Sequence, residues 1–367
     1  MIDFRHPIRS LPLSLVGLAV LVASFAPAGY GQTSSPFVES DTGYAYGQTD
    51  VPRRPVATYS IVARDSVTGQ MGVAVQSHWF SVGSVVPWAR AGVGAVATQS
   101  FVDPRYGPLG LELMHHGRTA EEALNALVST DAARAVRQVA MVDAEGRVAA
   151  HTGENAIQAA GHQTGNGYSV QANLMESDKV WGAMAKAYET SEGDLAARLV
   201  AALEAAQDEG GDIRGKQSAA LLIVGPESTG QPWNDRIFDL RVEDHPEPVQ
   251  ELKRLVRLQR AYQKLNEGDG HVTEGNIESA MESYRTAMGL VPDSATNGEA
   301  PFWVGITLAS EGRVDEAIPF LRRAFAQDER WAELVERLPA AGLLPSEDLA
   351  KTLKKRMKAD VEPESTE

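Results

Sequence analysis

The stretch TYSIVARDSVTGQMGVAVQS (residues 58–77) decides how the chain folds. Its two halves are rich in β-branched and small apolar residues, and the turn-forming cluster of residues 65–69 separates them. This pattern predicts two strands, residues 58–64 and 71–77, that pair as a hairpin. The folded part of the chain therefore opens with an antiparallel β-sheet.

Strand and helix patterns follow each other in blocks on the C-terminal side of this hairpin. Apolar residues that return every three or four positions predict helices, and β-branched runs bounded by turns predict strands. The expected strands cover residues 91–99, 136–143, 147–151, 168–174 and 217–224, and the expected helices cover residues 109–114, 119–128, 180–188 and 194–206. Such blocks favour an α/β (α+β) fold with two mainly antiparallel sheets between helical layers over a doubly wound parallel sheet.

The N-terminal end of the chain carries an export pattern. Arg5 and Arg9 precede an apolar run from Leu11 to Phe25, and the small residues Ala26-Pro27-Ala28 follow. Basic, apolar and small residues in this order are typical of a secretory signal peptide. The run is shorter than the roughly 20 residues that cross a bilayer, so a retained anchor is the weaker interpretation. We expect a signal peptide over residues 1–28 and a periplasmic or secreted protein without a membrane span after cleavage.

Composition limits the partners and cofactors. A net charge of -15 and a pI near 5.1 argue against a nucleic-acid partner, because neutralising phosphates needs clustered Lys and Arg. The chain has no cysteine and so forms no disulfide, even in an oxidising compartment. Its eight histidines are scattered, and no glycine-rich phosphate loop leads from a strand into a helix. We therefore expect neither a metal nor another cofactor.

Polar, turn-rich segments divide the chain into parts. Residues 29–55 and 227–248 show no helical or strand period and are expected to be linkers. They delimit an α/β domain over residues 56–226. A helical region is expected over residues 249–350, and residues 351–367 form a polar tail.

The helical region contains a degenerate repeat. Small and apolar residues return about one 34-residue period apart, at the spacing of a tetratricopeptide (TPR) unit. They are Ala280, Tyr284, Ala287 and Pro292 in the first unit, and Gly305, Leu308, Ala317, Leu321 and Ala324 in the second. Two repeats cannot bury a continuous core alone, so we expect them to dock on a flanking helix near residues 251–265 or on the α/β domain. A TPR-like region predicts a protein partner, and a homodimer is also compatible with the sequence.

Four stretches resemble a family known as domain of unknown function 1028 (DUF1028), which is grouped with the N-terminal-nucleophile (Ntn) hydrolases. They are TYSIVARD (58–65), GVAVQSHWFSVGSVVPWARAGVGAVATQS (72–100), GNGYSVQANLM (165–175) and GGDIRGKQSAALLIV (210–224). The resemblance implies a four-layer αββα sandwich, the architecture that the strand and helix pattern also favours. It implies hydrolysis of an amide bond only by analogy, because function depends on the site rather than on the fold.

Thr58 is the candidate nucleophile that the resemblance implies. In an Ntn hydrolase the first residue of the first strand is Thr, Ser or Cys, and its own α-amino group acts as the general base. An α-amine with a pKa near 8 accepts the hydroxyl proton at neutral pH, so no histidine is needed. Because Ala57 precedes Thr58, the mechanism requires a cut between these two residues. The alternative is an ordinary β-branched strand residue without a free amine.

Three further residues are candidates for catalysis. Ser77 ends the second strand of the hairpin and is expected to face the same cleft as Thr58, whereas the adjacent His78 is expected to be solvent-facing or hydrogen-bonded. Gln171 and Asn173 alternate along one strand and so face the same side. Their amides are suited to donate to an oxyanion or to bind a peptide backbone. Satisfied core amides are the alternative.

Four residues are candidates for substrate binding. Gln99 and Arg105 lie at and after the end of a strand, where loops often place ligand-binding groups. Arg105 could pair a substrate carboxylate with two hydrogen bonds, or it could make an ordinary salt bridge. Asp212 and Arg214 lie in a glycine-rich turn. They could brace the turn by pairing with each other, or border the cleft and bind an amino-acid-like substrate.

The sequence thus supports two classes of function. The leading hypothesis is an exported Ntn-type amidohydrolase that acts on a peptide or amino-acid amide bond. The alternative is a non-catalytic envelope protein, whose α/β domain binds a peptide or small ligand and whose TPR-like region recruits a partner. The N-terminal residue of the mature protein discriminates between them, because only the first hypothesis requires a chain that starts at Thr58.

Overall fold

The computed structural model describes residues 56 and 58–359, and the expected signal peptide and the linker up to residue 55 lie outside the described residues. The strands are β1 (Thr58–Arg64), β2 (Met71–Ser77), β3 (Pro87–Arg90), β4 (Gly94–Ser100), β5 (Arg137–Asp143), β6 (Val148–Thr152), β7 (Gly161–Gly165), β8 (Tyr168–Asn173), β9 (Ser218–Val224) and β10 (Arg236–Val242). The helices are α1 (Tyr106–His115), α2 (Ala120–Thr130), α3 (Val180–Thr190), α4 (Leu195–Asp208), α5 (Pro248–Thr273), α6 (Ile277–Leu290), α7 (Glu299–Ser310), α8 (Val314–Gln327), α9 (Trp331–Val335) and α10 (Glu347–Lys358).

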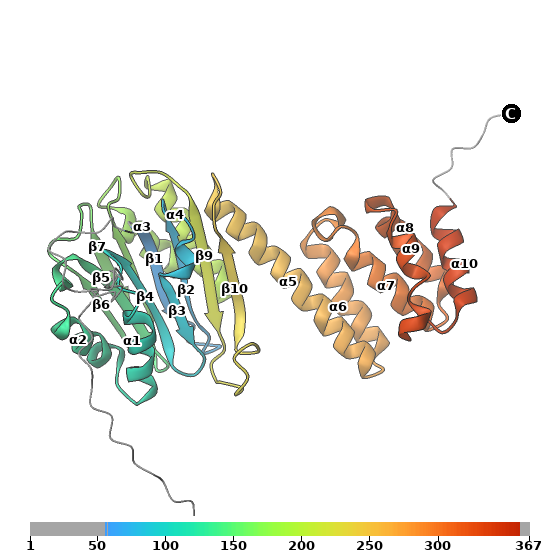
Figure 1. Ribbon diagram of the computed structural model, residues 1–367, viewed down its shortest axis with the longest axis horizontal. Helices are drawn as coiled ribbons and strands as arrows, with labels where there is room; N and C mark the ends of the chain where they lie inside the picture. The colour runs from blue at the N-terminus through green and yellow to red at the C-terminus, as the bar shows by residue number, and fades with distance from the viewer. Residues whose placement is uncertain (1–55, 57, 360–367) are drawn as a thin grey trace, which may run out of the picture. The chain divides into compact units, whose positions relative to one another are not determined.

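Two antiparallel sheets form the α/β part of the protein (Figure 1). The six-stranded sheet has the order β10-β9-β2-β1-β8-β7, and the four-stranded sheet has the order β3-β4-β5-β6. Every described strand pair is antiparallel. The expectation of a mixed α/β protein with antiparallel sheets is confirmed, and the hairpin of β1 and β2 begins and ends as the sequence predicts.

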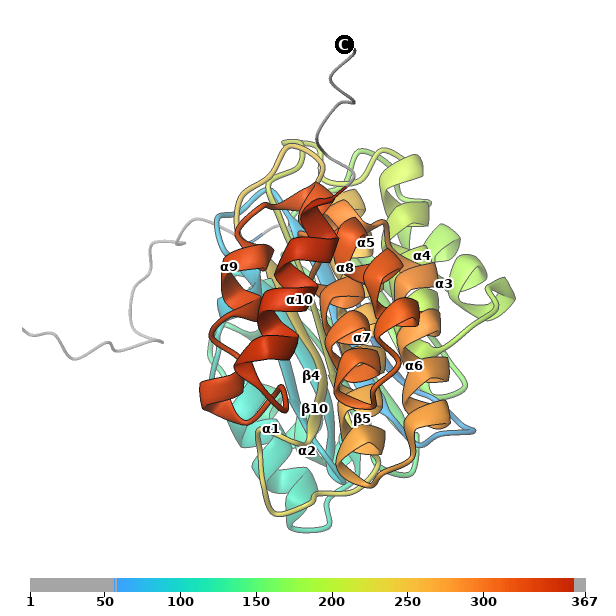
Figure 2. The same ribbon diagram turned by 90° about the vertical axis from the view of Figure 1, so that its right-hand side faces the viewer.

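The two sheets pack face to face, and helices cover their outer faces. Helices α1 and α2 contact the four-stranded sheet, whereas α3 and α4 contact the six-stranded sheet. Figure 2 shows α3 and α4 on the opposite side of the sheets from α1 and α2. Strand β1 is buried on both faces: Tyr59 and Ile61 pack in the cluster beneath α3 and α4, and Val62 packs in the cluster between the sheets. The polar residues of β1, Thr58 and Ser60, are therefore buried as fully as its apolar ones.

The sequence around the helices contains the signals that start them. Helix α2 begins with a capping box, in which the Thr119 hydroxyl accepts from the Glu122 N–H and the Glu122 carboxylate accepts from the Thr119 N–H. Helix α4 begins at the N-cap Asp194, whose carboxylate accepts from the Ala197 N–H. These caps satisfy backbone donors that the first helical turn leaves free.

The expectation that residues 227–248 form a linker is wrong, because this segment contains strand β10. Strand β10 pairs with β9 and forms one edge of the six-stranded sheet. The first turns of α5 belong to the same core: Val249, Leu252 and Val256 pack in the cluster that contains β1 and α4. The α/β part therefore extends well past residue 226.

A helical region follows, and its core is separate from that of the sheets. Of the residues that the repeat pattern singled out, all but the exposed Pro292 are buried here, including Ala280, Tyr284, Gly305 and Leu321. Helix α5 packs on α6, and α7 packs on α8. A Cβ at Gly305 would lie 2.6 Å from Cγ of Leu321, so the close approach of α7 and α8 requires glycine there.

The C-terminal end also differs from expectation. Residues 351–358 were expected to belong to a polar tail, but they form most of α10. Ala350, Leu353 and Met357 of this helix are buried in the helical core, which explains why an otherwise charged segment is ordered. Among the described helices, none combines the length and the hydropathy needed to cross a membrane.

Candidate functional site

Thr58 lies at the start of β1, between the two strands that supply other candidate residues. It is opposite Ser77 of β2 and opposite Asn173 of β8. The Thr58 side chain is fully buried, and its hydroxyl donates to the carbonyl oxygen of Val56 at 2.8 Å. The Ser77 hydroxyl lies 3.3 Å from it. The structure therefore brings Thr58, Ser77 and Asn173 together.

Buried amides join the two sheets next to Thr58. Nε2 of Gln99, from the four-stranded sheet, donates to Oε1 of Gln138 at 2.7 Å and to the Thr58 carbonyl at 3.2 Å. Nδ2 of Asn173 donates to the same Gln138 oxygen at 2.9 Å. Gln171 donates to the Ser60 hydroxyl at 2.6 Å, and Ser60 donates to Oε1 of Gln99 at 2.7 Å. Gln99 and Gln171 thus make hydrogen bonds within the protein, which is the satisfied-amide alternative.

Two buried acceptors in this region have no hydrogen-bond partner among the described residues. They are Oδ1 of Asn173 and Oγ of Ser100. Asn173 lies opposite Thr58 on the neighbouring strand, and Ser100 lies opposite Val56 in an isolated bridge. Buried polar groups are nearly always hydrogen-bonded. The two unpartnered oxygens therefore indicate a place where the site can accommodate a further hydrogen-bond donor.

Val56 covers the start of β1. Its N–H donates to the Ser100 carbonyl at 2.7 Å, and the Ser100 N–H donates to the Val56 carbonyl at 3.0 Å. Its side chain is 1% exposed and packs in the cluster between the sheets. Val56 thus lies against the end of β4 in the four-stranded sheet, whereas Thr58 begins β1 near the middle of the other sheet. The Thr58 hydroxyl is shielded from solvent.

Three residues other than glycine adopt left-handed backbone conformations near the strand ends that surround Thr58. Ser100 ends β4 with a φ of 69°, Leu174 follows β8 with a φ of 59°, and Ser81 lies shortly after β2 with a φ of 57°. Left-handed conformations are costly for residues other than glycine, and they are concentrated at functional sites. Their position at the Thr58 end supports this end as the functional one.

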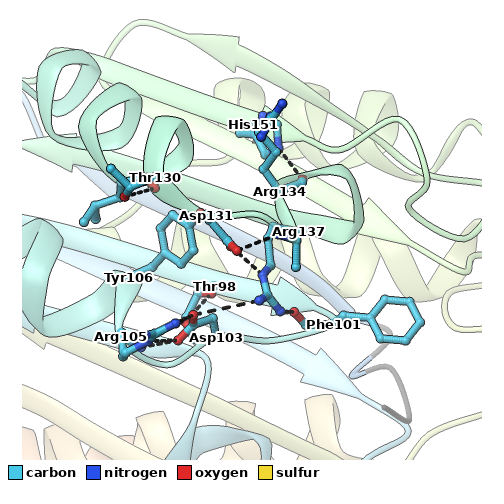
Figure 3. A network of polar contacts seen from close by, with 12 residues as sticks. Thr98, Phe101, Asp103, Arg105, Tyr106, Thr130, Asp131, Arg134, Arg137 and His151 are labelled. Carbon is cyan, nitrogen blue, oxygen red and sulfur yellow. Dashed lines mark hydrogen bonds and ion pairs between the residues drawn. The ribbon is translucent and has the colours of Figure 1, made fainter. Parts of the chain in front are cut away.

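Arg105 makes an ion pair with Asp103 within the protein (Figure 3). Its Nη2 lies 2.7 Å from Oδ2 of Asp103, which is the salt-bridge alternative of the sequence analysis. Arg137 completes the network: its Nε lies 2.7 Å from Oδ2 of Asp131, and its guanidinium donates to the Phe101 carbonyl. These contacts fix the loop that follows Ser100.

The electrostatics of this network follow from burial and charge. Burial raises the pKa of Asp131, but hydrogen bonds from Arg137 and from the Ala133 N–H outweigh it, so the pKa lies below its usual value. Tyr106 donates to Asp131 at 3.1 Å. Burial, followed by the nearby Asp131 charge, raises the pKa of Tyr106 well above its usual value. The network therefore holds a carboxylate that is ionised at neutral pH.

Asp212 and Arg214 also pair with each other. Nη2 of Arg214 lies 2.8 Å from Oδ2 of Asp212, and Nε lies 3.0 Å from Oδ1. The same carboxylate accepts from the His78 N–H at 3.0 Å, directly after Ser77. The pair thus braces the turn and also holds the end of β2 near Thr58. Of the two interpretations of the sequence, the bracing one describes these contacts.

Sequence reasoning missed several members of the site. Ser60 alternates with Thr58 along β1 and faces the same side. Gln138 is an amide at an inward position of β5, next to the apolar run of residues 139–142. Polar residues at inward strand positions were the available signal for both. Ser100 lies at the strand end where the sequence already indicates ligand-binding groups, and the folded backbone adds its left-handed conformation. No cluster of His, Asp or Glu among the described residues is placed to hold a metal ion.

Comparison with known proteins assigns the α/β part of the chain to a protein family. The fold is that of a mixed α/β protein with antiparallel sheets and a C-terminal helical region. The family described as "Family of unknown function (DUF1028)" matches residues 58–252, and the chain belongs to this family. The match runs from the first residue of β1 into α5, and so includes β10.

One solved structure similar to this chain is the crystal structure of protein SPO2555 from Silicibacter pomeroyi, of the same family. It is 32% identical in sequence, with a TM-score of 0.49, and the similarity covers 55% of this chain and 85% of that chain. No curated protein matches the chain.

Proposed function

We propose that the protein is an exported hydrolase of the N-terminal-nucleophile type, whose paired sheets form an αββα sandwich. Thr58, released by a cut after Ala57, attacks an amide bond in a peptide or an amino-acid amide. One observation carries the proposal: Thr58 is the first residue of a central strand, with its hydroxyl beside Ser77 and its strand neighbour Asn173 holding a buried oxygen without a partner.

The partnerless acceptors fit the charge that the cut would create. A free α-amine at Thr58 brings hydrogen-bond donors to a place where Oδ1 of Asn173 and Oγ of Ser100 lack them. When the severed leader, the chain up to Ala57, dissociates, the Val56 carbonyl that holds the Thr58 hydroxyl leaves with it. The amine and these oxygens would then form one connected group.

The reaction proceeds in two steps. The amine takes the hydroxyl proton while Oγ1 of Thr58 bonds to the amide carbon, and the amine returns that proton to the leaving nitrogen as the C–N bond breaks. A water molecule then hydrolyses the ester and restores the threonine. Gln99 and Gln171 act as positioning residues in this scheme, because their amides hold β1 rather than face a substrate.

The uncut chain favours a second candidate function. The Thr58 side chain is 0% exposed, and its hydroxyl already has a partner. Without a cut, the α/β domain would serve as a non-catalytic binding module in the cell envelope. The helical region, which we propose to be TPR-like, would recruit a protein partner in either case, since helix pairs of this kind present extended binding surfaces.

N-terminal sequencing and mass analysis of protein isolated from its native envelope test the proposal. An active hydrolase yields a chain that begins Thr58-Tyr59-Ser60. Thr58→Ala abolishes turnover of a panel of peptide and amino-acid amides, whereas Thr58→Ser retains part of it, because a hydroxyl remains beside the same amine. Thr164→Ala, at an exposed position of β7, is the control and leaves activity unchanged. Chains that all retain Ala57, in preparations that still hydrolyse amides, would contradict the amine-assisted mechanism.

A further inference from the structure

Val56 pairs with the end of β4 in the way that an extended peptide pairs with the edge of a sheet. Strand β3 pairs with β4 as far as Ala97, and the carbonyl of Val86, just before β3, accepts from the Thr98 N–H. Val56 takes the next place along this edge, at Ser100, in an antiparallel bridge. The bridge consists of two hydrogen bonds between backbone groups, so any peptide residue in this place can form it.

The side chain of Val56 occupies an apolar place between the two sheets. It is 1% exposed and packs in the cluster between the sheets, whose buried members are all Val, Ala or Met. Val75, two residues before Ser77, and Val86 belong to this cluster, which therefore reaches the end of β2 beside Thr58. Such surroundings favour an aliphatic side chain. They disfavour a charged one, because an apolar cluster does not replace its hydration.

The same place adjoins the proposed nucleophile. The Val56 carbonyl accepts from the Thr58 hydroxyl at 2.8 Å. Val56 also lies on the acyl side of the bond that must be cut, because it precedes Thr58 in the chain. Loss of the leader leaves the Ser100 N–H and carbonyl without these partners, and buried backbone groups are nearly always paired. A substrate whose acyl part reaches Thr58 from this side would restore both hydrogen bonds.

We propose that the acyl part of the substrate binds where Val56 lies in the uncut chain. The substrate is a peptide in which a β-branched aliphatic residue, valine or isoleucine, comes immediately before the residue that carries the scissile amide. Its backbone forms the bridge with Ser100, and its aliphatic side chain fills the place of the Val56 side chain. An aromatic side chain overpacks a place that valine fills, and glycine leaves it empty. This substrate preference rests on the proposed function, because the cut before Thr58 is what vacates the place.

Turnover by the mature protein isolated from its native envelope tests the preference. The probes are acetyl-dipeptide p-nitroanilides with alanine next to the anilide, as in the sequence before Thr58, and with valine, isoleucine, glycine, phenylalanine or aspartate before the alanine. Hydrolysis breaks the C–N bond of the anilide, and water supplies the hydroxyl of the new carboxyl group and one proton of the released p-nitroaniline. We expect kcat/KM for the valine and isoleucine probes to exceed that for the other three at least tenfold. A probe with N-methylvaline lacks the N–H that the Ser100 carbonyl accepts, and its kcat/KM should fall about fivefold or more.

A binding measurement separates this preference from the hydrolytic reaction. Its sample is a chain of residues 58–367 that carries Thr58→Ala and begins where the family match begins. NMR titration with acetyl-valyl-alanine amide should give a Kd at least tenfold lower than titration with the glycyl and aspartyl analogues, because only valine buries an apolar side chain. The matched control is Thr58→Ala in the uncut chain, in which Val56 fills the place, and it should bind none of these peptides. Valine-selective binding without any turnover would support this binding site and contradict the proposed hydrolase.

Three results would overturn the preference. One is the absence of any difference between the valine and glycine probes, in kcat/KM or in Kd, which leaves the hydrolase intact but excludes a selective place at Val56. Another is equal binding of the valyl peptide to the uncut chain, which would put the peptide site elsewhere. The third is a chain of residues 58–367 that circular dichroism shows to be unfolded, because the vacated place must exist in a stable protein.

Discussion

Gln99 and Gln138 join their side-chain amides across neighbouring strands, with Nε2 of Gln99 2.7 Å from Oε1 of Gln138. Each amide also reaches the opposite sheet: Gln99 donates to the Thr58 carbonyl at 3.2 Å, and Gln138 donates to the Ala172 carbonyl at 2.9 Å. The pair therefore connects the two sheets at a depth that excludes solvent. Hydrogen bonds take the place of apolar packing between the sheets at this point, and several of these bonds are made by the side chains of Gln99 and Gln138.

Replacement of Gln99 by leucine is expected to be strongly destabilising. Gln99→Leu leaves the Gln138 oxygen and the Ser60 hydroxyl with fewer partners in a buried place, and each such loss costs about 1–3 kcal/mol. Urea denaturation should show the free energy of unfolding fall by about 3 kcal/mol or more. Asn125→Leu, which removes an exposed amide on α2, should change it by less than about 0.5 kcal/mol. Similar values for both variants would mean that the inter-sheet amides contribute little.

The Asp131 carboxylate is expected to contribute to acid unfolding. Its pKa is lower in the folded protein than in the unfolded chain, so the unfolded chain binds the proton more tightly. The contribution to stability is complete above the unfolded pKa of about 4 and is lost as the pH falls through the folded pKa. Asp131→Asn should therefore lower the melting temperature at pH 7 and flatten its decline below about pH 4. An unchanged decline would contradict this, and Asp178→Asn, at an exposed site, is the control.

Truncated chains should show whether the α/β domain ends at residue 226 or includes β10 and the first turns of α5. A chain that ends after residue 226 lacks β10, exposes the edge of β9 and loses Val249, Leu252 and Val256 from the core. It should aggregate, because an uncovered apolar edge promotes association between chains. A chain that ends after Tyr262 keeps these elements and should remain soluble and folded. Size-exclusion chromatography distinguishes the outcomes, and a soluble monomer from the shorter chain would show that β10 is dispensable.

Two glycines of the helical region should respond in opposite directions. Gly305→Ala places a Cβ 2.6 Å from Cγ of Leu321 and should destabilise the helical region by about 1–3 kcal/mol through overpacking. Gly289→Ala, on α6, meets no atom within 4 Å and should stabilise the helix by up to about 1 kcal/mol, because alanine is the better helix former. Thermal unfolding followed at 222 nm measures both. A stabilising Gly305→Ala would mean that α7 and α8 adjust easily.

Export is a prediction of the sequence alone. The mature chain should begin near Gly29 or Gln32, because small residues follow the apolar run there. Intact-mass measurement of the exported fraction checks this. Retention of Met1 in that fraction would exclude cleavage of a signal peptide.

The elements that the sequence predicts well are those with a strong local period. Strands β1 and β2 are bounded by clear turns, and α2 carries its own capping box, so local pattern and tertiary structure agree. Strand β7 was not predicted because GHQTG is polar and lies half-exposed at a sheet edge. Strand β10 was not predicted because glycine and proline surround it, and these residues usually indicate a linker.

The sequence could predict contacts in the candidate site only between residues that are close along the chain, such as those of a hairpin. Pairing in the hairpin places Ser77 opposite Thr58, and this contact follows from the turn alone. Gln138 reaches the same place from the other sheet, a contact that depends on how the sheets stack. The pairing of Arg105 with Asp103 rather than with a ligand also depends on side-chain geometry that a sequence does not specify.

The bridge between Val56 and Ser100 has a consequence for any cut before Thr58. Val56 would keep its two backbone hydrogen bonds and its buried side chain after the covalent link is broken. The severed leader would then remain as a bound product, and the new amine would gain access to substrate only at the rate at which the leader dissociates. Native mass spectrometry would report one intact particle where denaturing electrophoresis reports two fragments. A lag before turnover, shortened by dilution, would measure the residence time of the leader.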